Sequence, residues 1–303
     1  MELEVKSLTK VFKSRNKTIT ALKNVSFRLK EGEKLAIVGE SGSGKTTLGK
    51  ILVGLEKPDS GEVLLDGKVI INPKKEIDLE SRRNFSMIFQ DPYDSLNPTK
   101  TVFDIVAFPL RIRKVPDDIL REAVYTSLND VGLSPPDQFL LKYPTQLSGG
   151  QRQRVAIARA IVYKPKVLIA DEPTTMIDAS LKAEVIKTML DIALKYKMSL
   201  ITITHDFSIV PIIADKVIVM YKGEIVEEGE AKDIIKNPRH PYTQALIAAV
   251  PKLLGEFSLK IKEIEEDGVC PFYSRCPLRI DKCKREEPPL QDIGNRKVKC
   301  FLV

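Results

Sequence analysis

Residues 39–46 read Gly-Glu-Ser-Gly-Ser-Gly-Lys-Thr, the complete G-x-x-x-x-G-K-[S/T] pattern of a phosphate-binding loop. The loop follows the apolar run 35–38 and opens a stretch with a helical pattern that extends to Gly54. Glycines allow several backbone N–H groups to converge on phosphate oxygens, and the N-terminus of the following helix adds a positive field. We expect Lys45 to reach the β- and γ-phosphates and the Thr46 hydroxyl to bind Mg²⁺. The pattern predicts a protein that binds a nucleoside triphosphate.

The rest of the chain alternates short apolar runs with helical patterns, which is typical of a parallel sheet with crossover helices. Further strands, buried on both faces, are expected at 86–89, 167–170 and 200–204. Residues 2–30 and 61–71 alternate more regularly and indicate a small antiparallel layer. The prediction is an α/β fold with a mostly parallel sheet.

The domain organisation follows from two changes in composition. Residues 101–145 are polar, have a helical period and are interrupted by prolines, which indicates an inserted helical subdomain. From about Asn237 the chain is rich in proline, cysteine and charge. We predict a nucleotide-binding domain over residues 1–236, with the helical subdomain at about 92–163, and a small C-terminal extension over 237–303.

Charge and hydropathy restrict the location. The chain is charged from its first residues, which does not fit a signal peptide, and it has no apolar run of the roughly 18 residues that a membrane helix needs. We expect a soluble or peripheral, intracellular protein. The net charge of +7 permits contact with nucleic acid or an anionic membrane, but lysines spread over a solvated surface are the favoured explanation.

A second phosphate-handling element ends the strand predicted at 167–170. Asp171 and Glu172 follow four apolar residues directly. We expect Asp171 to hold Mg²⁺ and Glu172 to polarise the attacking water. An acidic turn after a strand is common, so the preceding phosphate loop is what favours the functional interpretation.

A third element, Leu-Ser-Gly-Gly-Gln at 147–151, precedes a strong helix former at 152–160. Ser148 is a good N-cap, and the glycines leave the backbone open at the helix start, so this is a second anion-binding helix terminus. An ordinary capped helix is the alternative. The complete motif, placed shortly before Asp171, resembles the signature motif of ATP-binding cassette (ABC) proteins.

The resemblance to ABC proteins implies roles for further residues. Gln90 resembles the Q-loop glutamine, His205 the switch histidine, and Asp178 the aspartate of the D-loop, in which Met176-Ile177 departs from the usual Ala-Leu. Phe12 lies where the family stacks an aromatic ring on adenine, although a core aromatic is the alternative. Expected catalytic residues are Lys45, Gln90, Glu172 and His205. Expected nucleotide contacts are Phe12, Gly39, Ser41, Gly42, Ser43, Gly44, Lys45, Thr46, Thr47, Gln90, Ser148, Gly149, Gly150, Gln151, Asp171 and Asp178, with Thr46, Gln90 and Asp171 at Mg²⁺.

The same resemblance implies a head-to-tail dimer. Each ATP would lie between the phosphate loop of one cassette and the signature helix of the other, and hydrolysis would open the dimer. Because the residues for turnover are present, we predict an ATPase. A non-catalytic subunit that binds ATP without hydrolysing it is the alternative.

Longer motifs indicate a subfamily. Residues 90–98, 143–146 and 237–246 resemble the ATPases of oligopeptide and dipeptide importers. The resemblance implies a peripheral subunit on the cytoplasmic membrane face that pairs with a paralogous ATPase, or with itself, docks on two permeases and receives solute from an extracellular binding protein. Relatives carry peptides, nickel chelates or oligosaccharides. An ABC ATPase acting on nucleic acid remains an alternative, but the interval between phosphate loop and signature lacks the long coiled coil of such proteins, so no nucleic acid is expected.

All four cysteines, Cys270, Cys276, Cys283 and Cys300, lie near the C-terminus. An intracellular chain disfavours disulfides, so clustered thiols indicate a metal site. The spacing lacks the tight pair usual for zinc and suits an iron–sulfur cluster better. The resemblance also implies a [4Fe–4S] cluster, because some members of the subfamily hold one in this extension. Zinc and unligated thiols are the alternatives.

Overall fold

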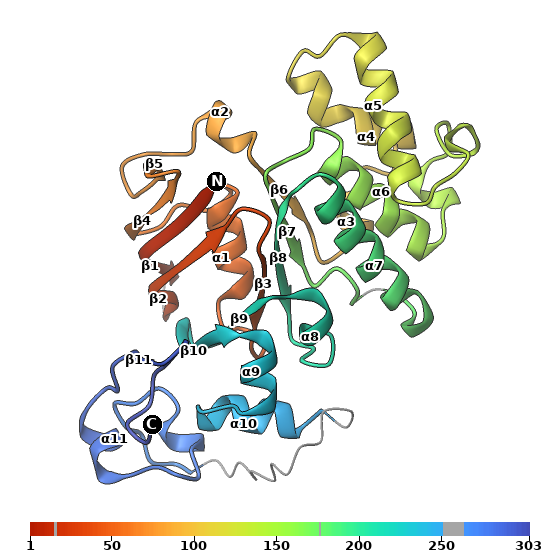
Figure 1. The fold of residues 1–303 in the computed structure, drawn as a ribbon. Coiled ribbons are helices and arrows are strands. Elements are labelled where there is room, and N and C mark those ends of the chain that lie inside the picture. The colour runs from red at the N-terminus through yellow and green to blue at the C-terminus, as the bar shows by residue number, and fades with distance from the viewer. Residues whose placement is uncertain (15–16, 176, 251–263) are drawn as a thin grey trace. The chain divides into compact units, whose positions relative to one another are not determined.

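The computed structural model describes residues 1–14, 17–175, 177–250 and 264–303 (Figure 1). The chain forms two compact units. Unit 1 combines residues 1–77 with 202–303, and unit 2 comprises residues 78–201. The phosphate loop and the C-terminal extension therefore belong to the same unit.

Unit 1 contains a four-stranded antiparallel sheet in the order β2-β1-β4-β5, which confirms the predicted antiparallel layer. Strand β1 pairs with a neighbouring strand on each side, so that Leu3 lies opposite Leu29 of β2 and Leu65 of β4. Alternate residues such as Leu3 and Val5 are buried, as expected of a sheet with one face toward a core. The strands are β1 (Glu2–Ser14), β2 (Lys17–Lys30), β4 (Ser60–Leu65) and β5 (Lys68–Ile71).

A second sheet segment of unit 1 carries the phosphate loop. Strand β3 (Lys34–Val38) pairs in parallel with β9 (Lys216–Tyr221), and β9 pairs antiparallel with β10 (Glu224–Glu230). The extension then adds two short antiparallel strands, β12 (Arg296–Val298) on β10 and β11 (Gln291–Ile293) on β12. The helices of unit 1 are α1 (Lys45–Leu52), α8 (Val210–Ile213), α9 (Ala231–Lys236), α10 (Pro241–Ala248) and α11 (Asp281–Arg285), with the 3₁₀ turn η3 (Tyr273–Arg275).

Unit 2 contains the parallel pair β6 (Phe85–Ile88) and β7 (Val167–Asp171), in which Ile88 lies opposite Ala170. All five residues of β7 are buried, which fits a parallel strand covered on both faces. Strand β8 (Ser199–Thr204) begins in unit 2 and ends in unit 1. The strands predicted from 86, 167 and 200 thus form, each within one residue of its expected start.

The helices of unit 2 surround one hydrophobic core. Side chains from α4, α5, α6 and β7, such as Val106, Val124, Ile157 and Leu168, are fully buried in it. Thr101 caps α4 by accepting a hydrogen bond from the backbone N–H of Asp104, as a threonine N-cap should. The elements are α2 (Leu79–Arg82), α3 (Pro92–Ser95), α4 (Val102–Ile112), α5 (Asp117–Asp130), η1 (Pro136–Gln138), η2 (Pro144–Gln146), α6 (Gly149–Ile161) and α7 (Ala179–Lys195).

Candidate functional site

The phosphate loop joins β3 to α1 in unit 1. Two of its glycines lie so close to neighbouring backbone that a side chain at either position would clash. A Cβ on Gly39 would lie 2.2 Å from the carbonyl oxygen of Met220 in β9. A Cβ on Gly44, which has a φ of +100°, would lie 2.2 Å from the carbonyl oxygen of Ala21 in β2. The loop is therefore enclosed by backbone on two sides, and its conformation depends on close approach as well as on glycine's freedom at positive φ.

The Lys45 side chain is buried within the loop. Its Nζ donates to the carbonyl oxygens of Gly39 at 2.7 Å and Glu40 at 2.8 Å, and to the Ser43 hydroxyl at 3.3 Å. These bonds hold the cation against the loop on which phosphate is expected. Thr46 and Thr47 are half-buried in the first turn of α1, and Ser41 and Gly42 are exposed at the loop's tip.

The carboxylates of Asp171 and Glu172 lie at the carboxyl end of β7 in unit 2. Asp171 is 2% exposed. Glu172 has a φ of +44°, which is uncommon for a residue with a side chain and is often found at functional sites. Its Oε2 accepts hydrogen bonds from Gln90 Nε2 at 3.1 Å and from the Thr175 hydroxyl at 3.0 Å. The structure thus brings the expected water-positioning carboxylate and the expected Q-loop amide into direct contact.

The signature motif begins α6, also in unit 2. The Ser148 hydroxyl accepts a bond from the backbone N–H of Gln151 at 3.3 Å, and the Gln151 side chain accepts one from the N–H of Ser148 at 3.1 Å. This reciprocal pair is a capping box. Gly149 and Gly150 form the first helical turn and are half-buried, so their backbone remains partly accessible to an anion.

The remaining predicted residues lie at chain positions that solvent can reach. Phe12 is 39% exposed, which rules out the alternative of a core aromatic, and Lys10 Nζ lies 5.1 Å from its ring centroid. His205 is exposed directly after β8, and Asp178 is exposed at the N-terminus of α7. Met176 of the predicted D-loop lies outside the described residues. The predicted site residues divide between the two units. Unit 1 contains Phe12, the phosphate loop and His205. Unit 2 contains Gln90, the signature motif, Asp171, Glu172 and Asp178.

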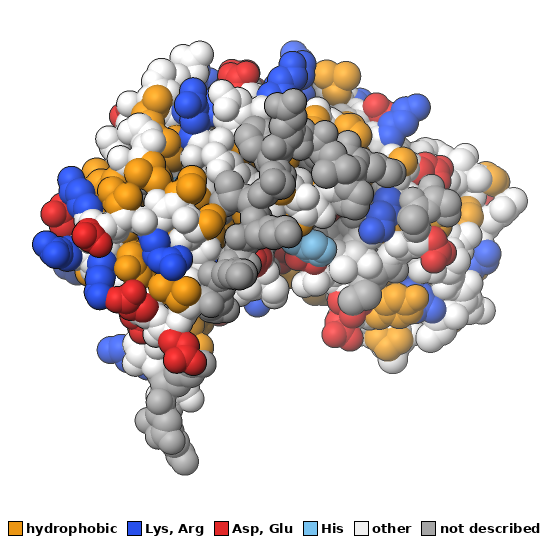
Figure 2. Space-filling model, turned by 90° about the horizontal axis from the view of Figure 1, so that it is seen from below, with side chains coloured by type: hydrophobic (Ala, Val, Ile, Leu, Met, Phe, Trp, Pro, Cys, Tyr) orange, Lys and Arg blue, Asp and Glu red, His pale blue; other side chains and the backbone are white. Residues whose placement is uncertain are grey.

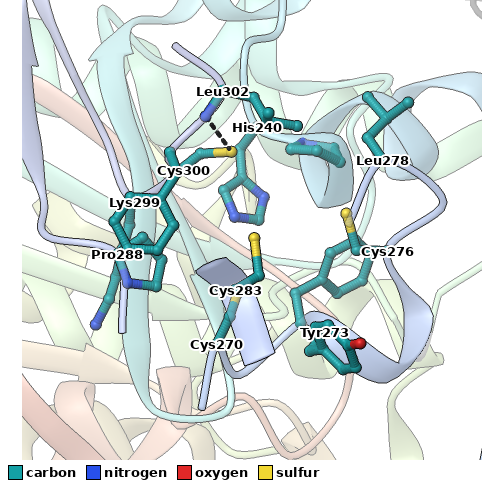
Figure 3. Close-up of a pocket in the computed structure, with 13 residues that line it drawn as sticks. His240, Cys270, Tyr273, Cys276, Leu278, Cys283, Pro288, Lys299, Cys300 and Leu302 are labelled. Atoms are coloured by element: carbon teal, nitrogen blue, oxygen red, sulfur yellow. Dashed lines mark hydrogen bonds between the residues drawn. The ribbon is translucent and has the colours of Figure 1, made fainter. Parts of the chain in front are cut away.

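The four cysteines of the extension line one small pocket (Figure 3). Cys276, Cys283 and Cys300 are buried and Cys270 is half-buried, and none of them forms a disulfide. Burial raises the pKa of the Cys276 thiol to about 11, so the thiol is protonated at neutral pH. No group of three His, Cys, Asp or Glu side chains in the described part of the chain is gathered closely enough to hold a metal ion.

The residues that hold Glu40, the second residue of the phosphate loop, were not predicted from the sequence. Arg275, from the extension, makes two hydrogen bonds of 2.8 Å to the Glu40 carboxylate. The hydroxyl of Tyr242 in α10 accepts a bond of 2.9 Å from the Glu40 N–H. An acidic side chain beside a phosphate site is the only sequence signal for these contacts, and it does not identify the partners.

Comparison with known proteins places the chain among the ATP-binding cassettes. The ABC transporter family model matches residues 22–175, and the model for the oligopeptide/dipeptide transporter C-terminal region matches residues 226–283. Among solved structures, the dimeric cassette MJ0796 in a post-hydrolysis state bound to ADP and Pi superposes with a TM-score of 0.66 and 31% identity, over 76% of this chain and 98% of that one. The cbiO1 protein from Clostridium perfringens, part of the ABC transporter complex cbiONQ, gives a TM-score of 0.67 at 31% identity, over 83% and 96% of the two chains.

The full-length relatives are more specific. The dipeptide transport ATP-binding protein DppF of Escherichia coli is 40% identical over 94% of this chain and 87% of its own length. The oligopeptide transport ATP-binding protein OppF of the same organism is 38% identical over 100% of this chain and 94% of its own length. The chain belongs to the ABC transporter family and has the C-terminal region of its oligopeptide/dipeptide branch. It is an ABC ATPase, a class that binds ATP and Mg²⁺, which confirms the predicted fold and enzyme class.

In the described part of the chain, no helix is both long and apolar enough to span a membrane.

Proposed function

We propose that this ATPase powers uptake of dipeptides, oligopeptides or a related solute across the cell membrane. The observation that carries this proposal is the match of residues 226–283 to the transporter C-terminal region, together with similarity to DppF and OppF along nearly the whole chain. Nickel chelates and oligosaccharides remain alternative cargoes, because the ATPase does not itself bind the solute.

An ABC ATPase that acts on nucleic acid is the alternative from another class. Positive and negative side chains are interspersed over the described part of the face in Figure 2. The charge pattern on this face is that of a solvated surface rather than of a nucleic-acid-binding one. We favour transport.

The proposed chemistry divides the site residues by role. Lys45 and the loop N–H groups would bind the β- and γ-phosphates, and Thr46, Gln90 and Asp171 would hold Mg²⁺, which offsets the phosphate charge when bound. The carboxylate of buried Asp171 and the hydroxyl of half-buried Thr46 are oxygen donors of the kind that Mg²⁺ prefers. Glu172 would orient and deprotonate the water, and His205 would stabilise charge on the γ-phosphate.

A second cassette would complete each site. Ser148, Gly149, Gly150 and Asp178 of the facing subunit would contact the nucleotide, and loss of the γ-phosphate would release the dimer. The facing subunit is a paralogous ATPase or a second copy of this chain.

The proposed partners in the membrane are two permeases, supplied with solute by an extracellular binding protein. Support comes from unit 2, where several large apolar side chains are exposed near the Q-loop segment and on the helices. These side chains would bind the permeases' cytoplasmic segments, which makes the ATPase peripheral on the cytoplasmic face. They are Tyr93, Phe108, Ile112, Ile119, Leu141 and Tyr143.

The proposed function is tested by isolating the Glu172→Gln variant with ATP from its native membranes and identifying the co-purifying proteins by mass spectrometry. Two permeases, a second cassette and a solute-binding protein are expected, and the binding protein can then be screened with peptides, nickel chelates and oligosaccharides. A Lys45→Ala variant is the control for ATP-dependent capture. Nucleic acid or repair proteins without membrane subunits would overturn the transport function.

We also propose that the four cysteines hold a [4Fe–4S] cluster that cross-links the extension and so stabilises its fold. Four thiols around one apolar pocket are the right ligand type, although the thiols are not drawn together at metal distance. In the described part of the extension the elements are short, from the three residues of β11 and of β12 to the eight of α10, so a cross-link would compensate for a small core.

The cluster is tested on protein purified without oxygen. About four iron atoms and four sulfides per chain are expected, and Cys283→Ser should remove most of the bound iron. Iron-free parent protein would overturn the cluster, and bound zinc would support the zinc alternative instead.

A further inference from the structure

All three polar groups of Glu40 are bonded, and two of them are bonded to residues far along the chain. Its carboxylate accepts two hydrogen bonds from Arg275, and its N–H donates to the Tyr242 hydroxyl. Its carbonyl accepts the hydrogen bond from Lys45 Nζ at 2.8 Å. The residue that positions the phosphate-binding lysine is thus itself positioned by two residues of the extension, Tyr242 of α10 and Arg275.

Tyr242 is fixed by a buried aromatic group. The ring centroids of Tyr242 and Tyr221 are 4.6 Å apart, and those of Tyr242 and Phe272 are 5.4 Å apart. All three residues are at most 3% exposed. Phe272 also lines the cysteine pocket, together with His240. A continuous set of packed side chains therefore leads from that pocket to the N–H of Glu40.

Arg275 ends the η3 turn, one residue before Cys276. The Arg275 guanidinium, which bonds both carboxylate oxygens, holds the pKa of Glu40 below its usual range. The negative Glu40 carboxylate would repel a bound triphosphate. Pairing with Arg275 neutralises this charge and fixes the Glu40 side chain in one position.

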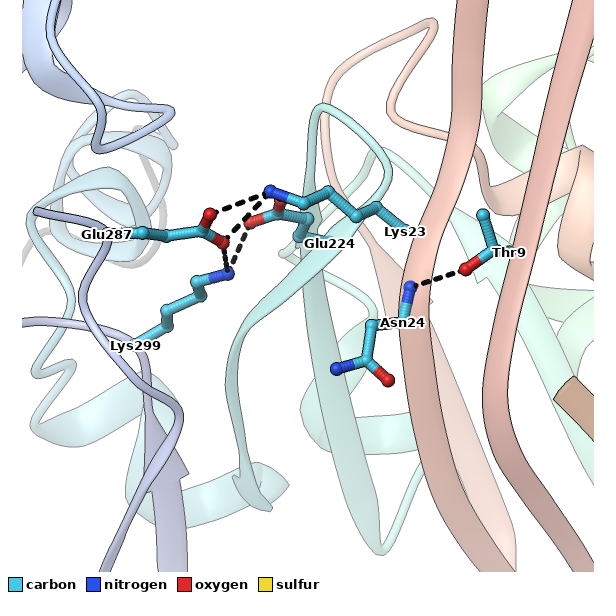
Figure 4. Close-up of polar contacts among 6 residues, drawn as sticks. All are labelled: Thr9, Lys23, Asn24, Glu224, Glu287 and Lys299. Carbon is cyan, nitrogen blue, oxygen red and sulfur yellow. Dashed lines mark hydrogen bonds and ion pairs between the residues drawn. The ribbon is translucent and has the colours of Figure 1, made fainter. Parts of the chain in front are cut away.

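A separate ion-pair group connects the extension to β2 and β10 (Figure 4). Lys23 of β2 and Lys299 of the extension both bind the carboxylates of Glu224 and Glu287, at 2.6 to 2.8 Å. Ala21 lies two residues before Lys23 in β2, and its carbonyl oxygen is the one that confines Gly44. The extension therefore contacts the loop directly at Glu40, and it binds β2 two residues away from the carbonyl that confines Gly44.

We propose that Arg275 and Tyr242 are positioning residues for the phosphate loop, through which the C-terminal extension sets the affinity for ATP. Arg275 neutralises and anchors the Glu40 side chain, and Tyr242 anchors its backbone, so that the carbonyl holding Lys45 keeps its place. The proposal rests on the assignment of residues 39–46 as the phosphate loop. It does not depend on the transported solute.

The test is a titration of the full-length chain with a fluorescent ATP analogue and Mg²⁺. Arg275→Ala is expected to raise the Kd about fivefold to tenfold, the effect of one partly exposed charge-assisted pair. Tyr242→Phe, which removes only the hydroxyl, is expected to raise it about threefold. Turnover at saturating ATP should stay within about twofold of the parent, because neither side chain touches the reacting atoms.

The matched control is Lys284→Ala, which breaks the ion pair of Lys284 with Glu266 elsewhere on the extension. Its Kd should equal that of the parent. An equal rise in Kd for Lys284→Ala and Arg275→Ala would overturn the proposal, because the effect would then reflect a weakened extension. A Kd for Arg275→Ala within about twofold of the parent would also overturn it.

Glu40→Gln provides the second check. Because Arg275 acts through the Glu40 carboxylate, Arg275→Ala should change the Kd by less than about twofold in the Glu40→Gln background, and independent effects would contradict the proposal. Lys45→Ala separates the two levels of failure. If Lys45→Ala still binds ATP as the parent does, the assignment of the phosphate loop is wrong. If Lys45→Ala loses ATP binding but Arg275→Ala binds ATP as the parent does, the loop assignment stands and only the positioning role of Arg275 is wrong.

Discussion

At the scale of single residues, Glu172 has the most demanding backbone in the proposed site. A side-chain residue at a φ of +44° carries a conformational cost of about 1 kcal/mol or more, which the surrounding contacts must offset. Gln90 and Thr175 both donate hydrogen bonds to its Oε2. A glutamine at position 172 can accept the same two bonds but cannot accept a proton from water.

We therefore expect Glu172→Gln to bind ATP within about threefold of the parental Kd while turnover falls at least about 100-fold. Phosphate release and nucleotide titration measure the two quantities separately. Glu122→Gln, an exposed glutamate on α5, is the control and should behave as the parent. Parental turnover in Glu172→Gln would show that another group activates the water.

How far a contact could be predicted depends on its separation in the chain. The bonds of Lys45 to Gly39 and Glu40 span six residues at most, so the contiguous motif contains them. The bonds of Glu40 to Arg275 and Tyr242 span 235 and 202 residues. Such pairs follow from tertiary packing, and nothing in the local pattern around Arg275 distinguishes it from a solvated arginine.

At the scale of secondary-structure elements, the buried strands were predictable because β7 and β8 are short apolar runs without helical period. The strands β9 and β10 escaped prediction. Strand β10 contains four glutamate residues, and its Glu227 is fully buried where β10 pairs with β12 at Val298. The local hydrophobic pattern does not anticipate a buried carboxylate that is satisfied by the N–H groups of Arg239 and His240.

The ion-pair group that joins β2, β10 and the extension gives a pH-dependent prediction. Burial acts to raise the pKa of Glu287, but hydrogen bonds from Lys23 and Lys299 outweigh it and lower the pKa. Because the folded-state pKa lies below the unfolded value of about 4.3, this stabilisation is complete above about pH 5 and is lost as the pH falls below about 4.

Glu287→Gln is expected to lower the free energy of unfolding by about 1 kcal/mol at pH 7, a value discounted because the side chain is about one-third exposed. The difference from the parent should shrink below about pH 4. Denaturant unfolding across a pH series measures it. The neighbouring Glu286→Gln, whose side chain is 62% exposed, is the matched control and should change stability by less than about 0.5 kcal/mol at any pH. A pH-independent loss in Glu287→Gln would show that packing, and not ionisation, is responsible.

At the scale of the whole molecule, the proposed nucleotide site depends on a second cassette. The phosphate loop lies in unit 1, and the signature helix α6 begins in unit 2 with an exposed Ser148. If Ser148 acts on the nucleotide of the facing subunit, a bulky cation at this position should block closure of the dimer without affecting ATP binding by a single chain.

Ser148→Arg is therefore expected to leave the Kd of the isolated chain for ATP within about twofold of the parent, while ATPase activity of the assembled transporter falls at least about tenfold. Ser148→Ala is the matched control, since it removes the helix cap at a cost of about 1 kcal/mol without adding bulk, and it should lose less activity than Ser148→Arg. Weakened ATP binding by the isolated Ser148→Arg chain would mean that the signature helix serves the nucleotide of its own chain. The same outcome would remove the reason for a head-to-tail dimer, because each cassette would then hold a complete site. Nucleotide titration of the single chain and phosphate release by the transporter distinguish these two arrangements.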